Sequence, residues 1–172
     1  NLTSHSYFNL SGGLEKNILG HKLRINADKI VEVREGYVPT GKLLGVENSS
    51  LDFTNFKKIG NGIDTENGFD YSWVVNKKDD ELTEAVSLLH EESGRRMTVY
   101  TTQPAIHFYS GHLLDGKMTD TKKGTEYGKY AGLCLEAQHF PDSPNHPEFP
   151  NTILKPGETY TETTIYSFGI EH

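Results

Sequence analysis

Short segments in which apolar and polar residues alternate are the feature that most constrains the fold of this chain. Apolar residues recur at every second position or in brief runs bounded by Gly, Asn, Asp or Pro, a pattern typical of strands. No window keeps apolar residues at i, i+3, i+4 and i+7 for three turns, so little helix is expected. Strands are predicted at residues 21–33, 70–76, 83–90, 95–103, 105–111, 130–138 and 159–170. This pattern predicts an all-β fold, an antiparallel β-sandwich.

Two connections are long for so small a β domain. Residues 38–67 are polar and rich in turn formers, and we predict one long loop there, a feature that is often functional in compact domains. The second connection carries Pro141, Pro144, Pro147 and Pro150. Each proline fixes its own φ and restricts the residue before it, so this loop should be stiff.

Charge and cysteine content limit the partners and the compartment. The 172 residues suffice for one domain, carry a net charge of −7 and contain no run of Lys or Arg longer than two. These properties argue against nucleic acid or an anionic membrane as partner and favour a neutral small molecule. The single cysteine, Cys134, cannot form an internal disulfide, and no apolar run approaches the ~20 residues of a membrane span. With no secretory signal evident, a cytoplasmic protein is expected.

Glu136 lies at the end of a short apolar strand, beside the proline-rich loop. Alternation places Cys134, Glu136 and Gln138 on one face of this strand, and Leu133 and Leu135 on the other. A carboxylate half-screened from water has a raised pKa and accepts protons better near neutral pH. Glu136 is therefore a candidate catalytic base, although this segment alone more often means an outward-facing strand glutamate.

His5 and Asp70 are further candidates. His5 stands among hydroxyl side chains that can fix its tautomer, and imidazole exchanges protons near neutral pH. It is a candidate general acid or else an ordinary loop residue. Asp70 opens an apolar run, so it would stand at a strand mouth, where a carboxylate accepts hydrogen bonds from ligand hydroxyls. The same position equally fits an ordinary turn residue whose side chain hydrogen-bonds to its own backbone.

No metal site is predicted. His139, Asp142 and His146 offer ligand atoms, but their spacing matches no zinc pattern and the intervening prolines hinder convergence. No glycine-rich phosphate loop or nucleophile elbow occurs. Nucleophilic catalysis thus has no candidate constellation.

Four motifs resemble those of the galactose mutarotase (aldose 1-epimerase) family and occur in the same order. Asn-Leu-Thr-Ser-His-Ser-Tyr-Phe-Asn-Leu occupies residues 1–10, and Gly-Phe-Asp occupies 68–70. Thr-Thr-Gln-Pro runs into Phe-Tyr within 101–109, and Leu-Glu-Ala-Gln precedes Phe-Pro-Asp within 135–150. The resemblance covers essentially the whole chain, and motifs this long and specific rarely agree by chance.

The resemblance implies an isomerase without cofactor that interconverts the α and β anomers of galactose, glucose or similar free hexoses. It assigns Glu136 as general base, His5 as general acid and Asp70 as a residue that binds sugar hydroxyls. Glu136 would take the proton of the C1 hydroxyl while His5 protonates the ring oxygen. The ring then opens, C1–C2 rotates, and reclosure gives the other anomer. Because Glu136 must be ionised and His5 protonated, a bell-shaped pH–rate profile is expected.

Three positions depart from the family pattern. His107 stands where the family usually has a glutamine that contacts the sugar, so His107 is a candidate substrate-binding residue that could shift sugar preference. Ser4 replaces the usual asparagine beside the acid, and His112 stands where asparagine is common. Milder effects are expected at these two positions.

The resemblance also predicts how much of the fold is present. Family members are about twice this length, so residues 1–172 are expected to be the C-terminal part of a single aldose 1-epimerase domain. This part of a larger supersandwich would leave sheet edges exposed and would need the N-terminal half as its partner. Two alternatives stay open: a non-catalytic carbohydrate-binding module derived from the same fold, and a glycosidase that uses Glu136 and Asp70 as its carboxylate pair.

Overall fold

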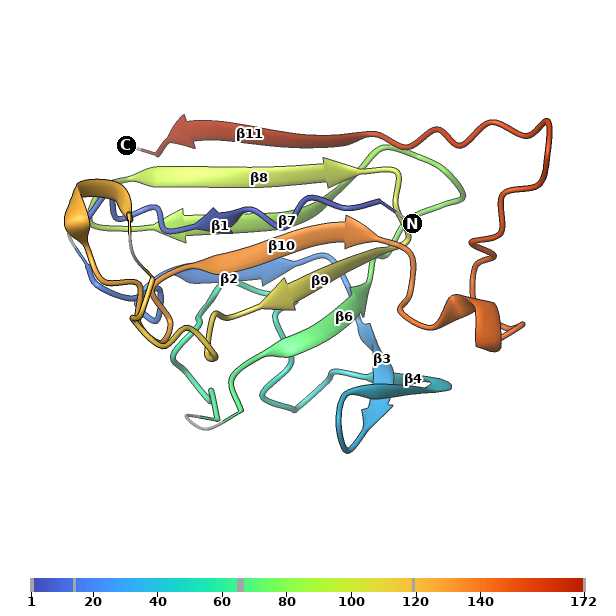
Figure 1. Cartoon of the computed structure of the whole chain (residues 1–172), viewed down its shortest axis with the longest axis horizontal. Coiled ribbons are helices and arrows are strands. Elements are labelled where there is room, and N and C mark those ends of the chain that lie inside the picture. The colour runs from blue at the N-terminus through green and yellow to red at the C-terminus, as the bar shows by residue number, and fades with distance from the viewer. Residues whose placement is uncertain (1, 14, 65–66, 119, 172) are drawn as a thin grey trace.

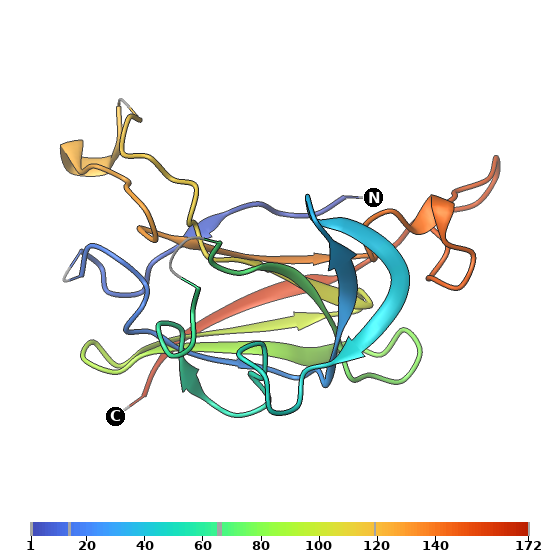
Figure 2. The same ribbon diagram turned by 90° about the horizontal axis from the view of Figure 1, so that it is seen from below.

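The computed structural model of the chain is a sandwich of two antiparallel β-sheets, seen from two directions in Figures 1 and 2. It describes residues 2–13, 15–64, 67–118 and 120–171. Asn1, the first residue of the N-terminal motif, lies outside the described residues. The architecture confirms the all-β, antiparallel sandwich expected from the sequence.

Each sheet joins strands that are distant in sequence. The six-stranded sheet has the order β1 (Tyr7–Phe8), β10 (Leu133–Gln138), β9 (Ala105–Tyr109), β6 (Asp70–Val74), β3 (Lys29–Arg34) and β4 (Val38–Gly45). The five-stranded sheet has the order β11 (Thr164–Ile170), β8 (Arg95–Thr101), β7 (Thr83–His90), β2 (Lys22–Ile25) and β5 (Lys57–Lys58).

Helix is confined, within the described residues, to two 3-10 turns, η1 (Lys122–Gly124) and η2 (Ser143–Asn145). The scarcity of helix expected from the sequence is thus confirmed. In the same part of the chain, no helix has the length and apolar character needed to cross a membrane.

Six of the seven predicted strand segments each contain one strand, β6 to β11, with ends within a few residues of the prediction. The seventh prediction, a single strand over residues 21–33, is wrong, because the chain passes from one sheet to the other inside it. β2 ends at Ile25 and β3 begins at Lys29. The Asn26 amide donates to the backbone oxygens of Asn76 and Glu84, which holds the crossing in place.

The prediction of one long loop over residues 38–67 is also wrong in part. Its first eight residues form β4, which pairs with β3, and Lys57–Lys58 forms β5. Gly36 and Tyr37, at φ of 79° and 59°, make the tight turn between β3 and β4. β4 is a largely exposed edge strand that contains one proline and two glycines, so it lacks the apolar alternation by which a strand is recognised.

The core between the sheets uses one side of each strand. In β10, Leu133, Leu135 and Ala137 enter this core, which confirms the predicted alternation. Cys134 and Glu136 therefore project from the opposite, outer face of the six-stranded sheet.

The proline-rich loop packs on that outer face. Phe140 and Phe149 form a small buried cluster with Val31 and Ala105. The sequence neighbours of the last two, Ile30 and Ile106, belong to the core between the sheets, so the small cluster lies on the opposite face. The Phe140 and Phe149 rings meet edge-on, with centroids 5.1 Å apart. The loop thus covers one end of the outer face.

Two histidines are buried at the other sheet. His21 and His90 are buried, and their ring centroids are 4.7 Å apart. Nε2 of His21 accepts the backbone N–H of Leu10 at 3.0 Å. Burial, together with the neighbouring His90, lowers the pKa of His21 from 6.5 to about 4, so His21 is neutral in the folded protein near pH 7.

We expect acid to destabilise the fold through His21. The unfolded chain takes up a proton below pH 6.5 whereas the folded chain does so only near pH 4. The contribution to stability is therefore complete above pH 6.5 and is lost as the pH falls towards 4, a loss of about 3 kcal/mol. Urea unfolding at pH 7 and pH 5 measures the part of this loss that falls between the two pH values, about 2 kcal/mol. His21→Gln, which can still accept the Leu10 N–H, should lose less between these pH values; equal losses would contradict the assignment.

Candidate active site

The sheet register gathers three of the four predicted site residues on the outer face of the six-stranded sheet. In adjacent strands, Glu136 of β10 lies opposite His107 of β9, and His107 lies opposite Ser72 of β6. Asp70 is two residues before Ser72 on β6, so it shares their face. The site thus combines one carboxylate from each of two strands with an imidazole from the strand between them.

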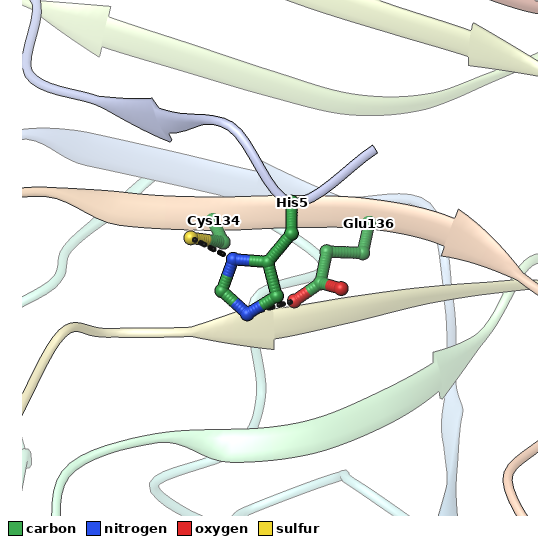
Figure 3. Close-up of side chains that lie close together, drawn as sticks. All are labelled: His5, Cys134 and Glu136. Atoms are coloured by element: carbon green, nitrogen blue, oxygen red, sulfur yellow. Dashed lines mark hydrogen bonds and ion pairs between the residues drawn. The ribbon is translucent and has the colours of Figure 1, made fainter. Parts of the chain in front are cut away.

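His5, the fourth predicted residue, comes from the segment just before β1. Pairing of Tyr7 with Cys134 places this segment along β10. Nε2 of His5 lies 3.4 Å from Oε1 of Glu136, and Nδ1 lies 3.4 Å from Sγ of Cys134, as Figure 3 shows. His5 is 55% exposed and Glu136 only 7%. A reachable imidazole therefore stands over a buried carboxylate.

The expectation that hydroxyl neighbours fix the tautomer of His5 is wrong. The nearby Ser4 and Ser6 hydroxyls hydrogen-bond to each other, at 3.2 Å between the Oγ atoms. The reason is the pairing of β1 with β10, which turns His5 towards the side chains of a distant strand. The partner of Nδ1 is consequently the Cys134 thiol.

The electrostatics of the site suit a base. Burial raises the pKa of Glu136, the imidazoles of His5 and His107 oppose that rise, and the Asp70 charge adds to it. Burial also raises the pKa of the Tyr7 phenol to about 12. The tyrosine therefore remains neutral beside the carboxylate.

Asp70 and His107 form a tight pair. Nε2 of His107 lies 2.7 Å from Oδ1 of Asp70, and Nδ1 lies 2.9 Å from Oγ of Ser72. Both ring nitrogens of His107 are thus engaged by the protein. In this geometry His107 orients Asp70, whose side chain stays partly exposed.

The turn before Asp70 requires a glycine. Gly68 has a φ of 59°, and a Cβ there would lie 2.6 Å from Oγ of Ser110 and 2.7 Å from the His112 side chain. His112 is buried. The His112 side chain packs under this turn. The histidine that stands in place of the family's usual asparagine therefore has a packing role next to the site.

Two groups of described residues place ligand atoms close enough for a metal ion. They are His5, Cys134 and Glu136, and Glu15, His21 and His90. In the first group, burial and the Glu136 charge raise the pKa of the Cys134 thiol to about 12, which disfavours the thiolate that a metal needs. In the second, Nε2 of His21 accepts an N–H, so the neutral ring carries its hydrogen on Nδ1, the remaining ligand atom. Neither group is suited to a metal as it stands.

His139, Asp142 and His146, weighed as a metal site on the proline-rich loop, do not form one three-residue cluster among the described residues. Nδ1 of His139 lies 2.7 Å from Oε1 of Gln103, whereas His146 pairs with Asp142 at 3.3 Å. The side chains of His139 and His146 therefore serve separate contacts.

Solved structures share this architecture. The GalM/aldose epimerase homologue from C. elegans matches with a TM-score of 0.87 and 29% identity over 99% of this chain and 51% of that chain. Galactose 1-epimerase from Lactobacillus acidophilus NCFM matches with a TM-score of 0.78 and 26% identity over 99% of this chain and 48% of that one. The fold is therefore of the galactose mutarotase-like class.

Sequence comparison gives the family. Residues 1–167 match the sequence model described as Aldose 1-epimerase, and the chain belongs to this family. It is 41% identical to mouse (Mus musculus) galactose mutarotase over 99% of its length, and 38% identical to aldose 1-epimerase of Escherichia coli strain K12 over 98%. The chain spans about half the length of these curated relatives, 50% of each.

Proposed function

We propose that this chain carries the acid–base pair of an aldose 1-epimerase acting on galactose, glucose or a similar free hexose. The observation that carries the proposal is the 3.4 Å approach of His5 Nε2 to a buried Glu136 carboxylate. Family membership and the names of its relatives, galactose mutarotase and aldose 1-epimerase, support the same chemistry.

In the proposed reaction, Glu136 accepts the proton of the C1 hydroxyl and His5 donates a proton to the ring oxygen. The C1–O5 bond breaks and leaves the open-chain aldehyde, which rotates about C1–C2. Reclosure returns each proton to the group that gave it, so no redox step or net proton transfer occurs. Asp70, oriented by His107, is the proposed acceptor for a sugar hydroxyl.

Polarimetry tests the proposal. The rotation of freshly dissolved α-D-galactose is followed with the 172-residue chain and with buffer alone. Faster approach to the anomeric equilibrium supports the proposed activity. Sugar binding detected by calorimetry without any acceleration would support a carbohydrate-binding module instead.

We further propose that residues 1–172 are the C-terminal part of one domain and that the N-terminal part covers an exposed apolar edge. On β11, Phe168 and Ile170 are 62% and 64% exposed, although the Phe168 ring lies 6.3 Å from that of Phe8. Phe8 belongs to β1, and Phe168 and Ile170 belong to β11. β1 and β11 are edge strands of the two sheets. Co-expression with the N-terminal half of a full-length relative tests this. Copurification and increased mutarotation are expected, and lack of association would contradict the proposal.

The cytoplasm is the proposed location. Cys134 is a buried free thiol, which suits a reducing compartment. Microscopy of the tagged full-length protein tests the proposal.

His107 should set the acid limb of the proposed pH–rate profile. Its imidazole opposes the rise in the pKa of Glu136, and glutamine would remove that effect while keeping a hydrogen-bond donor near Asp70. For His107→Gln we expect the acid limb of kcat/KM to move to higher pH, because Glu136 then ionises at higher pH. Polarimetric rates between pH 4 and 8 measure the change. His146→Gln, on the proline-rich loop, is the control and should leave the acid limb where it is in the wild type. If the acid limb fell at the same pH in the wild type and both variants, His107 would have no such effect on Glu136.

A further inference from the structure

The imidazole of His5 is held at both ring nitrogens by a single strand. Cys134 and Glu136 are two residues apart on β10, so they project from the same face, about 7 Å apart along the strand. Sγ of Cys134 lies 3.4 Å from Nδ1, and Oε1 of Glu136 lies 3.4 Å from Nε2. Figure 3 shows the ring lying between the two side chains.

The hydrogens of this arrangement can be assigned from the chemistry of the groups. An ionised carboxylate only accepts hydrogen bonds, so Nε2 of His5 needs a hydrogen to bond Glu136. A neutral imidazole has one N–H, which leaves Nδ1 bare and in need of a donor. The S–H of Cys134 is the group placed to donate. The other tautomer would turn the lone pair of Nε2 towards the carboxylate, which is repulsive.

The thiol keeps its hydrogen near neutral pH. Burial and the Glu136 charge raise the pKa of Cys134 to about 12. The other rings near His5 belong to Tyr7 and Tyr109, with centroids 5.3 and 6.3 Å away. Burial raises the pKa of both phenols, so neither is charged there. Of the neighbours named here, Glu136 is therefore the one that carries a charge next to His5.

We propose that Cys134 is a positioning residue for His5. A thiol both donates and accepts, so it can bond Nδ1 of the neutral ring as donor and N–H of the imidazolium as acceptor. In both protonation states Nε2 then stays directed at Glu136 and at the proposed sugar site. The kinetic consequence rests on the proposed function, whereas the tautomer is a property of the free chain.

NMR of the 172-residue chain with 15N-labelled histidine tests the proposal without substrate. The chain has eight histidines, and the signals of His5 are those that disappear in His5→Gln. For the neutral ring we expect hydrogen on Nε2 in the wild type and a mixture of tautomers in Cys134→Ala. In Cys134→Ser, whose hydroxyl also donates and accepts, the Nε2–H tautomer should be restored.

The controls separate positioning from folding. Unchanged signals of the buried His21 and His90 show that each variant is folded, and Cys134→Val replaces the alanine variant if that one does not fold. A wild type with hydrogen on Nδ1, or an unchanged tautomer in the variants without a donor, would overturn the proposal. These results do not depend on turnover, so an inactive chain leaves the test intact. Where turnover is measurable, Cys134→Ala should lower kcat about five- to tenfold with KM unchanged, and serine should recover it.

Discussion

Replacing Glu136 by Gln should lower the catalysed rate of mutarotation by ~10²- to 10⁴-fold, the usual contribution of a general base. Glutamine has nearly the same shape and can still face Nε2 of His5, but it cannot accept the proton of the C1 hydroxyl. The side chain is 7% exposed, so buffer bases have little access to replace it. Polarimetry of α-D-galactose with matched concentrations of folded protein measures the effect.

A conservative change elsewhere separates loss of the base from loss of charge or of fold. Glu148 lies on the proline-rich loop, is more than half exposed and pairs with His146. Glu148→Gln makes the same chemical change and should keep the wild-type rate. If Glu136→Gln retained more than a tenth of the activity, Glu136 would not be the base, even though it lies beside His5.

Short apolar segments bounded by turn residues were enough to predict the strands that are long and largely buried. β7 and β8 are largely buried strands that pair along most of their length, and the sequence prediction matches them closely. β4 could not be found in this way, because its contacts lie along one edge of β3 and most of its side chains are exposed. The division between β2 and β3 was hidden because apolar residues continue on both sides of Asn26, while the chain changes sheets there.

The outward direction of Glu136 also follows from alternation, which places Cys134 on the same face. The contacts of these side chains do not, since they depend on which strands are neighbours. Asp70 and His107 are 37 residues apart in sequence and meet only because β6 pairs with β9. The motif resemblance supplied the names of the site residues, but the pairing of His5 with Cys134 required the three-dimensional register.

Replacing Trp73 by Ala should destabilise the chain by ~3–5 kcal/mol, a large part of the stability of an ordinary domain. Trp73 is fully buried between the sheets. Its ring lies 6.0 Å from Phe53 and 5.9 Å from Phe108, and Nε1 donates to the backbone oxygen of Leu51 at 3.0 Å. Alanine leaves a cavity in this aromatic cluster and also leaves the Leu51 oxygen without its donor. Urea unfolding followed by far-UV circular dichroism measures the loss.

Two further variants divide that loss by cause. Trp73→Phe keeps a ring in the core but removes the N–H, so it should cost only about 1–3 kcal/mol, the penalty of one unsatisfied buried acceptor. Leu113→Ala removes an apolar side chain that is 73% exposed and should change stability by less than about 0.5 kcal/mol. If Trp73→Ala cost no more than Leu113→Ala, the two sheets would not be held together by this cluster. The outer face that carries His5 and Glu136 would then need another source of rigidity, because both residues depend on strands that pack against Trp73 and its neighbours.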